Sequence, residues 1–146
     1  MNNIQAEILA LDIERTVCPV LFGDLETDDM LVVEYEMESR ENWGDDPAIA
    51  YHTYLEDDYC DATGFKYRVH QIEWLEDVQL DIERFKTMIC HELVHIMQEF
   101  RGDNFDYSKK YTEQEHEIEA YDLEQYLVFY YNTKEHWKDE KDARHN

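Results

Sequence analysis

The stretch from Ile82 to Phe100 constrains the fold more than any other part of this chain. On a helical wheel, its large apolar residues fall within about 40° of Ile89. The apolar surface extends around much of the circumference through Val94 and Met97. A helix of this kind has to be covered by other elements on two sides. We therefore predict that this helix, called the central helix below, is covered on both sides and that Gly102 ends it.

Three segments before this helix alternate apolar with polar residues, and a period of two is typical of half-buried strands. They run from Leu31 to Met37, from Ile49 to Leu55 and from Phe65 to Ile72. The sequence therefore predicts a small three-stranded sheet that precedes the central helix.

A first helix is predicted at the N-terminus, where Asn2 or Asn3 can act as its cap and about Glu14 is its end. Its apolar side consists of Ile4, Ile8, Ala10 and Leu11. Pro19 and Pro47 are expected to mark turns.

A final helix is predicted after the central one, with Thr112 as its cap, Glu115 at the capping-box position and an end near Tyr131. The order of helix, three strands, helix and helix is typical of an α+β fold. Length and composition favour a single domain over residues 1–131. Residues 132–146 are almost wholly polar and are predicted to form a C-terminal extension.

The central helix contains the sequence HELVH at residues 91–95. At helical spacing, His91 and His95 project from one face one turn apart, so both imidazoles can reach a single metal ion. Glu92 lies beside them and can contact a water molecule on that ion without binding the metal itself. This arrangement predicts a zinc site on the central helix.

A zinc site needs a third protein ligand, which the final helix can supply. Glu119 shares the apolar stripe predicted for that helix, whereas Glu117 and Glu124 are predicted to lie on its outer, solvated face. The stripe consists of Leu123, Tyr126 and Tyr130. A carboxylate in an apolar stripe is costly unless it is paired or bound to metal. We therefore predict Glu119 as the third ligand, with Glu115 and His116, which flank the stripe, as alternatives.

The sequence HELVHIMQ followed by EIEAY resembles the HExxH…ExEA pattern of minimal zincin metallopeptidases such as the ImmA/IrrE-like family. It is also similar to the HELxH…NEA arrangement of thermolysin-like enzymes. The resemblance covers residues 88–126 and implies a zinc metallopeptidase of the gluzincin kind. By this resemblance, His91, His95 and Glu119 match the zinc ligands and Glu92 matches the catalytic base.

The predicted activity is hydrolysis of peptide bonds by a metal-activated water, with Glu92 as the general base. The oxyanion needs a further donor, and Tyr111, Tyr107 and His116 lie between the two ligand helices. Tyr111 is favoured because its offset before the third ligand resembles the thermolysin-like arrangement. The strand at residues 65–72 is predicted to be an edge strand that pairs with extended substrate, as in zincins.

The charge of the chain restricts its partners. It has 36 acidic and 13 basic residues, for a net charge of −23, and residues 1–65 hold 17 of the acids and two of the bases. Such a chain lacks the basic surplus needed to bind nucleic acid or anionic lipid, so a neutral or basic polypeptide is the expected substrate. The absence of a secretion signal and of an apolar span predicts a cytoplasmic protein, with a bacterial or phage origin possible. Cys18, Cys60 and Cys90 are then expected to be reduced thiols.

Two other functions are compatible with this sequence. The protein could be a non-enzymatic, acidic inhibitor that mimics DNA and occupies the basic groove of a nucleic-acid-binding enzyme. Alternatively, the zincin-like domain could hold a metal that is purely structural. Zinc content and hydrolytic activity distinguish the three hypotheses.

Overall fold

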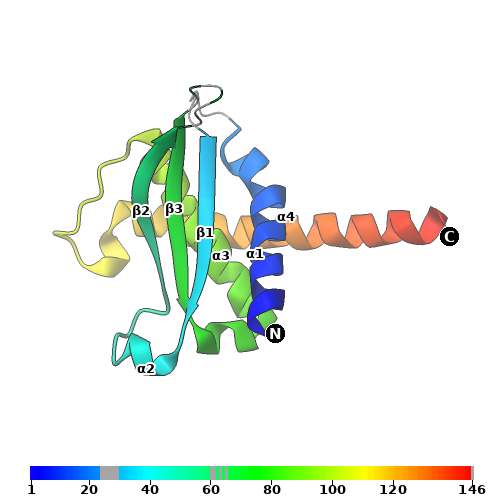
Figure 1. The fold of residues 1–146 in the computed structure, drawn as a ribbon, viewed down its shortest axis with the longest axis horizontal. Coiled ribbons are helices and arrows are strands. Elements are labelled where there is room, and N and C mark those ends of the chain that lie inside the picture. The colour runs from blue at the N-terminus through cyan, green and yellow to red at the C-terminus, as the bar shows by residue number, and fades with distance from the viewer. Residues whose placement is uncertain (24–29, 60–61, 63, 65, 146) are drawn as a thin grey trace.

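The computed structural model describes residues 1–23, 30–59, 62, 64 and 66–145, and these residues form an α+β fold with four α-helices and a three-stranded sheet (Figure 1). The α-helices are α1 (Asn3–Leu21), α2 (Arg40–Trp43), α3 (Ile82–Arg101) and α4 (Glu115–His145). The strands are β1 (Met30–Glu38), β2 (Ala50–Tyr59) and β3 (Lys66–Leu75). Two short 3-10 helices, η1 (Glu76–Leu80) and η2 (Tyr111–Glu113), precede α3 and α4. The predicted fold class and the three predicted strands are confirmed.

The strands are arranged in the order β1-β3-β2, so the sheet is mixed. β3 pairs in parallel with β1 and antiparallel with β2. The prediction that the strand at residues 65–72 is an edge strand is therefore wrong. After β1, the chain passes through α2 to β2, which lies one strand position away from β1. β3 then runs back along β2 and fills the position between the two, so it is the central strand. The edge strands of this sheet are β1 and β2.

The central helix α3 has the position that its sequence predicts. Asp81 caps its first turn by accepting hydrogen bonds from two backbone amides, and Gly102 ends it with a left-handed φ of 82°. Residues 88–98 are all buried, because α3 packs against the sheet, α1 and α4. One residue of the predicted apolar stripe, Ile82, is exposed. The core around α3 includes Trp74, Phe85, Ile89, Leu93, Ile96 and Leu127.

Helix α1 is longer than predicted and packs through a different face. It continues past Glu14 to Leu21, and Pro19 lies inside it and not in a turn. The buried face consists of Ala6, Ala10, Ile13 and Val17. The predicted apolar residues Ile4 and Ile8 are 70% and 62% exposed.

Helix α4 begins at Glu115, because Thr112, the predicted cap, lies in η2. The helix does not end near Tyr131 but runs on to His145. Figure 1 shows that its last turns extend away from the rest of the molecule. The polar residues 132–145 are thus the continuation of a helix, and Tyr131, just before them, is buried.

Cys18 and Cys90 are free, and Cys60 lies outside the described residues. Burial raises the pKa of the Cys90 thiol to about 12, so this thiol is unreactive at neutral pH. Within the described part of the chain, no helix combines the length and apolarity needed to cross a membrane.

Candidate metal centre

Helices α3 and α4 bring two histidines and one glutamate together in the interior. His91 and His95 lie on α3, and both contact Glu117 in the first turn of α4. The distance from Glu117 Oε1 to His95 Nε2 is 2.8 Å, and that from Glu117 Oε2 to His91 Nε2 is 3.1 Å. The two Nε2 atoms are 3.1 Å apart. The three residues are only 6–9% exposed, so three potential metal-binding atoms converge on one point inside the protein.

The Nδ1 atom of each histidine contacts a second polar side chain. Glu124, two turns after Glu117 on α4, is 2.8 Å from His91 Nδ1. Gln98 Oε1 is 2.8 Å from His95 Nδ1. Such contacts hold the ring orientation and leave each Nε2 directed at the point where the three side chains converge, which is the arrangement found in most histidine-ligated metal sites.

The third-ligand prediction is not supported, because the structure places Glu117 and not Glu119 with the histidines. Glu119 accepts a hydrogen bond of 2.6 Å from Arg101 and one of 2.9 Å from Gln98, and its side chain is 35% exposed. Its distance from the His91–His95 pair is explained by its angular position on α4, about 200° from Glu117 on an ideal helix. Glu119 thus supports the site indirectly, through Gln98.

The two alternative third ligands are also outside the group of three. The Glu115 side chain is 92% exposed and faces Lys109. The His116 side chain is buried, but its Nε2 lies 3.8 Å from Glu117 Oε1 and its ring stacks on Phe105. His116 is therefore a neighbour of the site.

The helical wheel misplaced these glutamates because it treated aromatic residues as the inward face. Tyr126 is 55% exposed, whereas Glu117 and Glu124 are 7% and 8% exposed. The buried stripe of α4 consists of Glu117, Ala120, Glu124, Leu127 and Tyr131. Its spacing of three and four residues is visible in the sequence, but two of its members are acidic, so a search for apolar residues passes over it.

Glu92 is buried next to the histidines. It is 8% exposed, and burial raises its pKa, although the nearby imidazoles oppose this shift. One of its oxygens, Oε2, lies 3.7 Å from Nδ1 of His52 on β2. Glu92 is not among the three converging ligands, as expected for a residue that acts on a water molecule and does not bind the metal.

The charges of the three converging residues are coupled. Burial alone would lower the pKa of His91, but its contacts with Glu117 and Glu124 outweigh burial and raise it to about 9. Burial likewise opposes ionisation of Glu117, yet contacts with His91, His95 and Tyr111 hold its pKa well below its usual value. The carboxylate is thus ionised at neutral pH and forms ion pairs with the two imidazoles, whose protons a bound divalent cation would displace.

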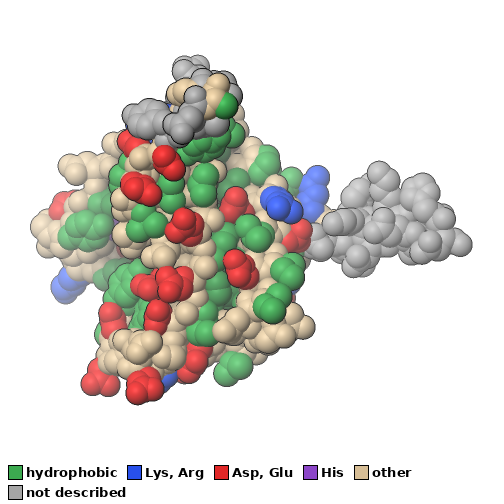
Figure 2. All heavy atoms as spheres, viewed as in Figure 1, with side chains coloured by type: hydrophobic (Ala, Val, Ile, Leu, Met, Phe, Trp, Pro, Cys, Tyr) green, Lys and Arg blue, Asp and Glu red, His purple; other side chains and the backbone are tan. Residues whose placement is uncertain are grey.

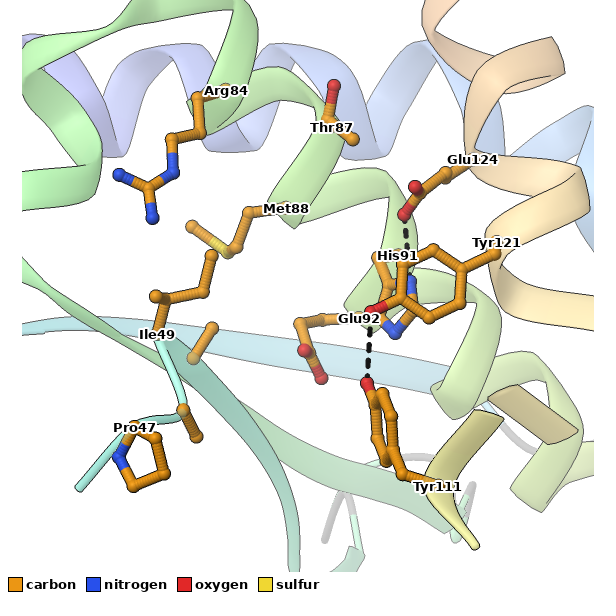
Figure 3. Close-up of a pocket in the computed structure, with 12 residues that line it drawn as sticks. Pro47, Ile49, Arg84, Thr87, Met88, His91, Glu92, Tyr111, Tyr121 and Glu124 are labelled. Atoms are coloured by element: carbon orange, nitrogen blue, oxygen red, sulfur yellow. Dashed lines mark hydrogen bonds and ion pairs between the residues drawn. The ribbon is translucent and has the colours of Figure 1, made fainter. Parts of the chain in front are cut away.

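A pocket of about 680 Å³ opens beside this group (Figure 3). His91, Glu92 and Glu124 lie at one end of it, and Figure 3 shows Tyr111 and Tyr121 directed toward them. The two tyrosine hydroxyls are 3.2 Å apart, and the Tyr121 ring packs on His91 with 4.7 Å between the ring centroids. The rest of the pocket is lined by Pro47, Ala48, Ile49, Ala50, Arg84, Thr87 and Met88.

Tyr111, the favoured oxyanion donor, therefore lies at the site, where it is also close enough to Glu117 to lower the pKa of that carboxyl. Tyr107, one alternative, is 69% exposed and packs on His116. Tyr121 is not predicted from the sequence, because a tyrosine two residues after Glu119 has no recognisable role there. His52 is not predicted either, because it comes from a strand far from the motif in sequence.

No family model matches the sequence, and the searches of curated proteins and of solved structures likewise found no match.

Proposed function

We propose that the protein is a zinc-dependent peptidase whose metal is bound by His91, His95 and Glu117. The observation that carries this proposal is the convergence of these three side chains beside a buried Glu92 at the end of an open pocket. Two imidazoles and one carboxylate are the ligand set of many catalytic zinc sites, which keep a fourth position open.

The spacing of the three donors fits such an ion. Ligand atoms around a tetrahedral zinc with bonds of about 2.0–2.1 Å lie about 3.4 Å apart. The donor atoms here are separated by 2.8 and 3.1 Å, so they need to spread by only a few tenths of an ångström. When bound, zinc lowers the pKa of a coordinated water to about 7 and polarises a carbonyl group.

The remaining roles follow from the residues around the donors. Glu92 accepts the proton of the attacking water and passes it to the leaving amine. Tyr111 and Tyr121 supply hydroxyl groups at the mouth of the site, where the oxyanion of the transition state forms. Glu124 and Gln98 hold the two histidines in the required orientation.

The pocket favours a substrate with an apolar side chain next to the cleaved bond, because Ile49, Met88 and Pro47 form much of its wall (Figure 3). The residues just before and at the start of β2, from Ala48 to Ala50, also line it. β2 is an edge strand, so an extended peptide can add to the sheet there. The net charge of −23 favours a neutral or basic chain as this peptide.

The Glu92→Gln variant tests the proposal. Glutamine keeps the shape of the side chain but cannot accept the proton, so we expect zinc binding to persist while hydrolysis falls by at least about 100-fold. Zinc content is measured by mass spectrometry of the purified protein. Hydrolysis is measured with a set of fluorescence-quenched peptides. These peptides are neutral or basic and have apolar residues at their centre.

Glu113→Gln is the matched control, because Glu113 is exposed in η2, and we expect it to leave both measurements unchanged. Undiminished hydrolysis by Glu92→Gln would contradict the proposed mechanism. Full zinc occupancy without hydrolysis of any peptide by the unaltered protein would favour the purely structural metal instead.

A further inference from the structure

We propose that the protein has a second metal site, formed by His52 of β2, His70 of β3 and Glu99 of α3, which binds a divalent transition-metal ion such as zinc. The site is separate from the group on α3 and α4 and does not depend on the proposed peptidase activity. Its ligands come from three elements that pack together, so the ion would join the sheet to the central helix.

The first support is the geometry of the donor atoms. His52 Nε2 is 3.1 Å from one oxygen of Glu99, and His70 Nδ1 is 3.5 Å from the other. One donor atom from each residue lies within 4.8 Å of the others. These separations are close to the value of about 3.4 Å for ligands around a tetrahedral zinc ion. Imidazole and carboxylate are donors that zinc and its neighbours in the first transition row accept.

The second support is the state of His70. Its side chain is fully buried, and neither ring nitrogen has a hydrogen-bond partner among the described residues. The ring instead packs against the aromatic rings of Tyr54 and Phe100. A buried polar group without a hydrogen bond is costly and uncommon. A metal ion bound to Nδ1 would satisfy the nitrogen that faces Glu99.

The third support is the orientation of His52. With Nε2 directed at Glu99, its other nitrogen, Nδ1, lies 3.7 Å from Glu92. A histidine that binds a metal usually directs its other N–H at a carboxylate or carbonyl oxygen. The His52 ring is also stacked on His95, with 5.6 Å between centroids and 23° between planes. An ion at this second site would therefore make His52 a positioning residue for Glu92.

Metal analysis of the whole chain tests the second site. The protein is freed of metal with a chelator, incubated with Zn²⁺ alone, dialysed and analysed for zinc per chain. We expect two equivalents in the unaltered protein, one in Glu99→Gln and one in His91→Ala. The Glu99 side chain is 29% exposed, so its replacement leaves no cavity in the core, and His70→Gln provides a second variant of the same site.

Glu83→Gln is the matched control on the same helix, because Glu83 is exposed near the start of α3, and we expect it to retain two equivalents. A single equivalent in the unaltered protein that persists in Glu99→Gln would overturn the second site and leave the first intact. A single equivalent that persists in His91→Ala but is lost in Glu99→Gln would support the second site and count against the proposed peptidase centre.

Discussion

At the scale of single residues, the chemistry depends on which glutamate of α4 reaches the two histidines. Glu117 and Glu119 are two positions apart, which on a helix places them on nearly opposite faces. One contacts His91 and His95, while the other pairs with Arg101. Two glutamates on one helix can therefore have different roles because of their angular position alone.

A pair of variants tests this difference directly. Glu117→Gln should weaken zinc binding at the HELVH site by more than about 10-fold, since it replaces a charged ligand with a neutral one. Glu119→Gln should leave that affinity nearly unchanged, because Glu119 acts only through Gln98. Affinity is measured by competition with a chromophoric chelator. The reverse result, with Glu119→Gln as the damaging change, would restore the interpretation based on the helical wheel.

The HELVH motif shows how much of the site the sequence could predict. His91, His95 and Glu92 were identified because their spacing is local and the helix that contains them is strongly patterned. Glu117 and His52 could not be assigned, because their positions depend on how α4 and β2 pack against α3. No periodicity within one segment contains that information.

At the scale of elements, α1 shows how packing can override a helix-breaking residue. Pro19 cannot donate a backbone hydrogen bond to the preceding turn, yet α1 continues through it to Leu21. The buried residues Ile13 and Val17 belong to the same face and pack on the core up to this point. Their burial offsets the missing hydrogen bond.

Replacing this proline should therefore stabilise the protein. Pro19 is exposed, so Pro19→Ala removes no buried contact and restores the amide hydrogen bond to the preceding turn. We expect the free energy of unfolding to rise by about 1–3 kcal/mol, as measured by urea denaturation. Val20→Ala, at the exposed neighbouring position, should change it by less than about 1 kcal/mol. A loss of stability in Pro19→Ala would show that the proline ring makes a favourable contact.

At the scale of the whole molecule, one acidic surface lies on the face of the sheet opposite the helices. Figure 2 shows acidic side chains spread over this face. Glu34 and Glu36 of β1 are exposed, and Glu36 lies opposite Glu73 of β3 in the strand register. The long helices cover the other face, where the candidate metal centre lies. The acidic surface and the candidate active site are thus on different sides of the sheet.

The pH dependence of stability should report the repulsion between Glu73 and its acidic neighbours. Burial, together with Glu36 and Glu38, raises the pKa of Glu73 above its usual value of 4.5. The charged form of Glu73 is therefore less favourable in the folded protein than in the unfolded chain, and this cost is present above the folded pKa. It disappears as the pH falls through that pKa.

Glu73→Gln should consequently stabilise the protein at pH 7 by about 0.2–1 kcal/mol, and the gain should vanish near pH 4. Urea denaturation at both pH values measures the difference. Glu7→Gln on the exposed side of α1 is the control and should show no such change with pH. An equal gain at both pH values would contradict an electrostatic origin.

The hypothesis that the acidic surface binds a basic partner stays a prediction. Because that surface lies on the sheet face opposite the helices, its binding can be tested without disturbing the candidate metal centre. A change in hydrolysis when the acids of β1 are neutralised would indicate that substrate contacts this face as well.

The sequence by itself determined the α+β class, the three strands, the central helix with the glycine that ends it, and the two histidines and one glutamate of HELVH. These features arise from periodicity and capping, which act over a few neighbouring residues. Only the tertiary structure decided that β3 is central, that Glu117 is the third converging ligand, and that His52, His70 and Glu99 meet. The physical reason is that these arrangements depend on which faces of separate elements become buried against one another. A buried acidic residue such as Glu117 is tolerated only when distant partners are in place to receive it.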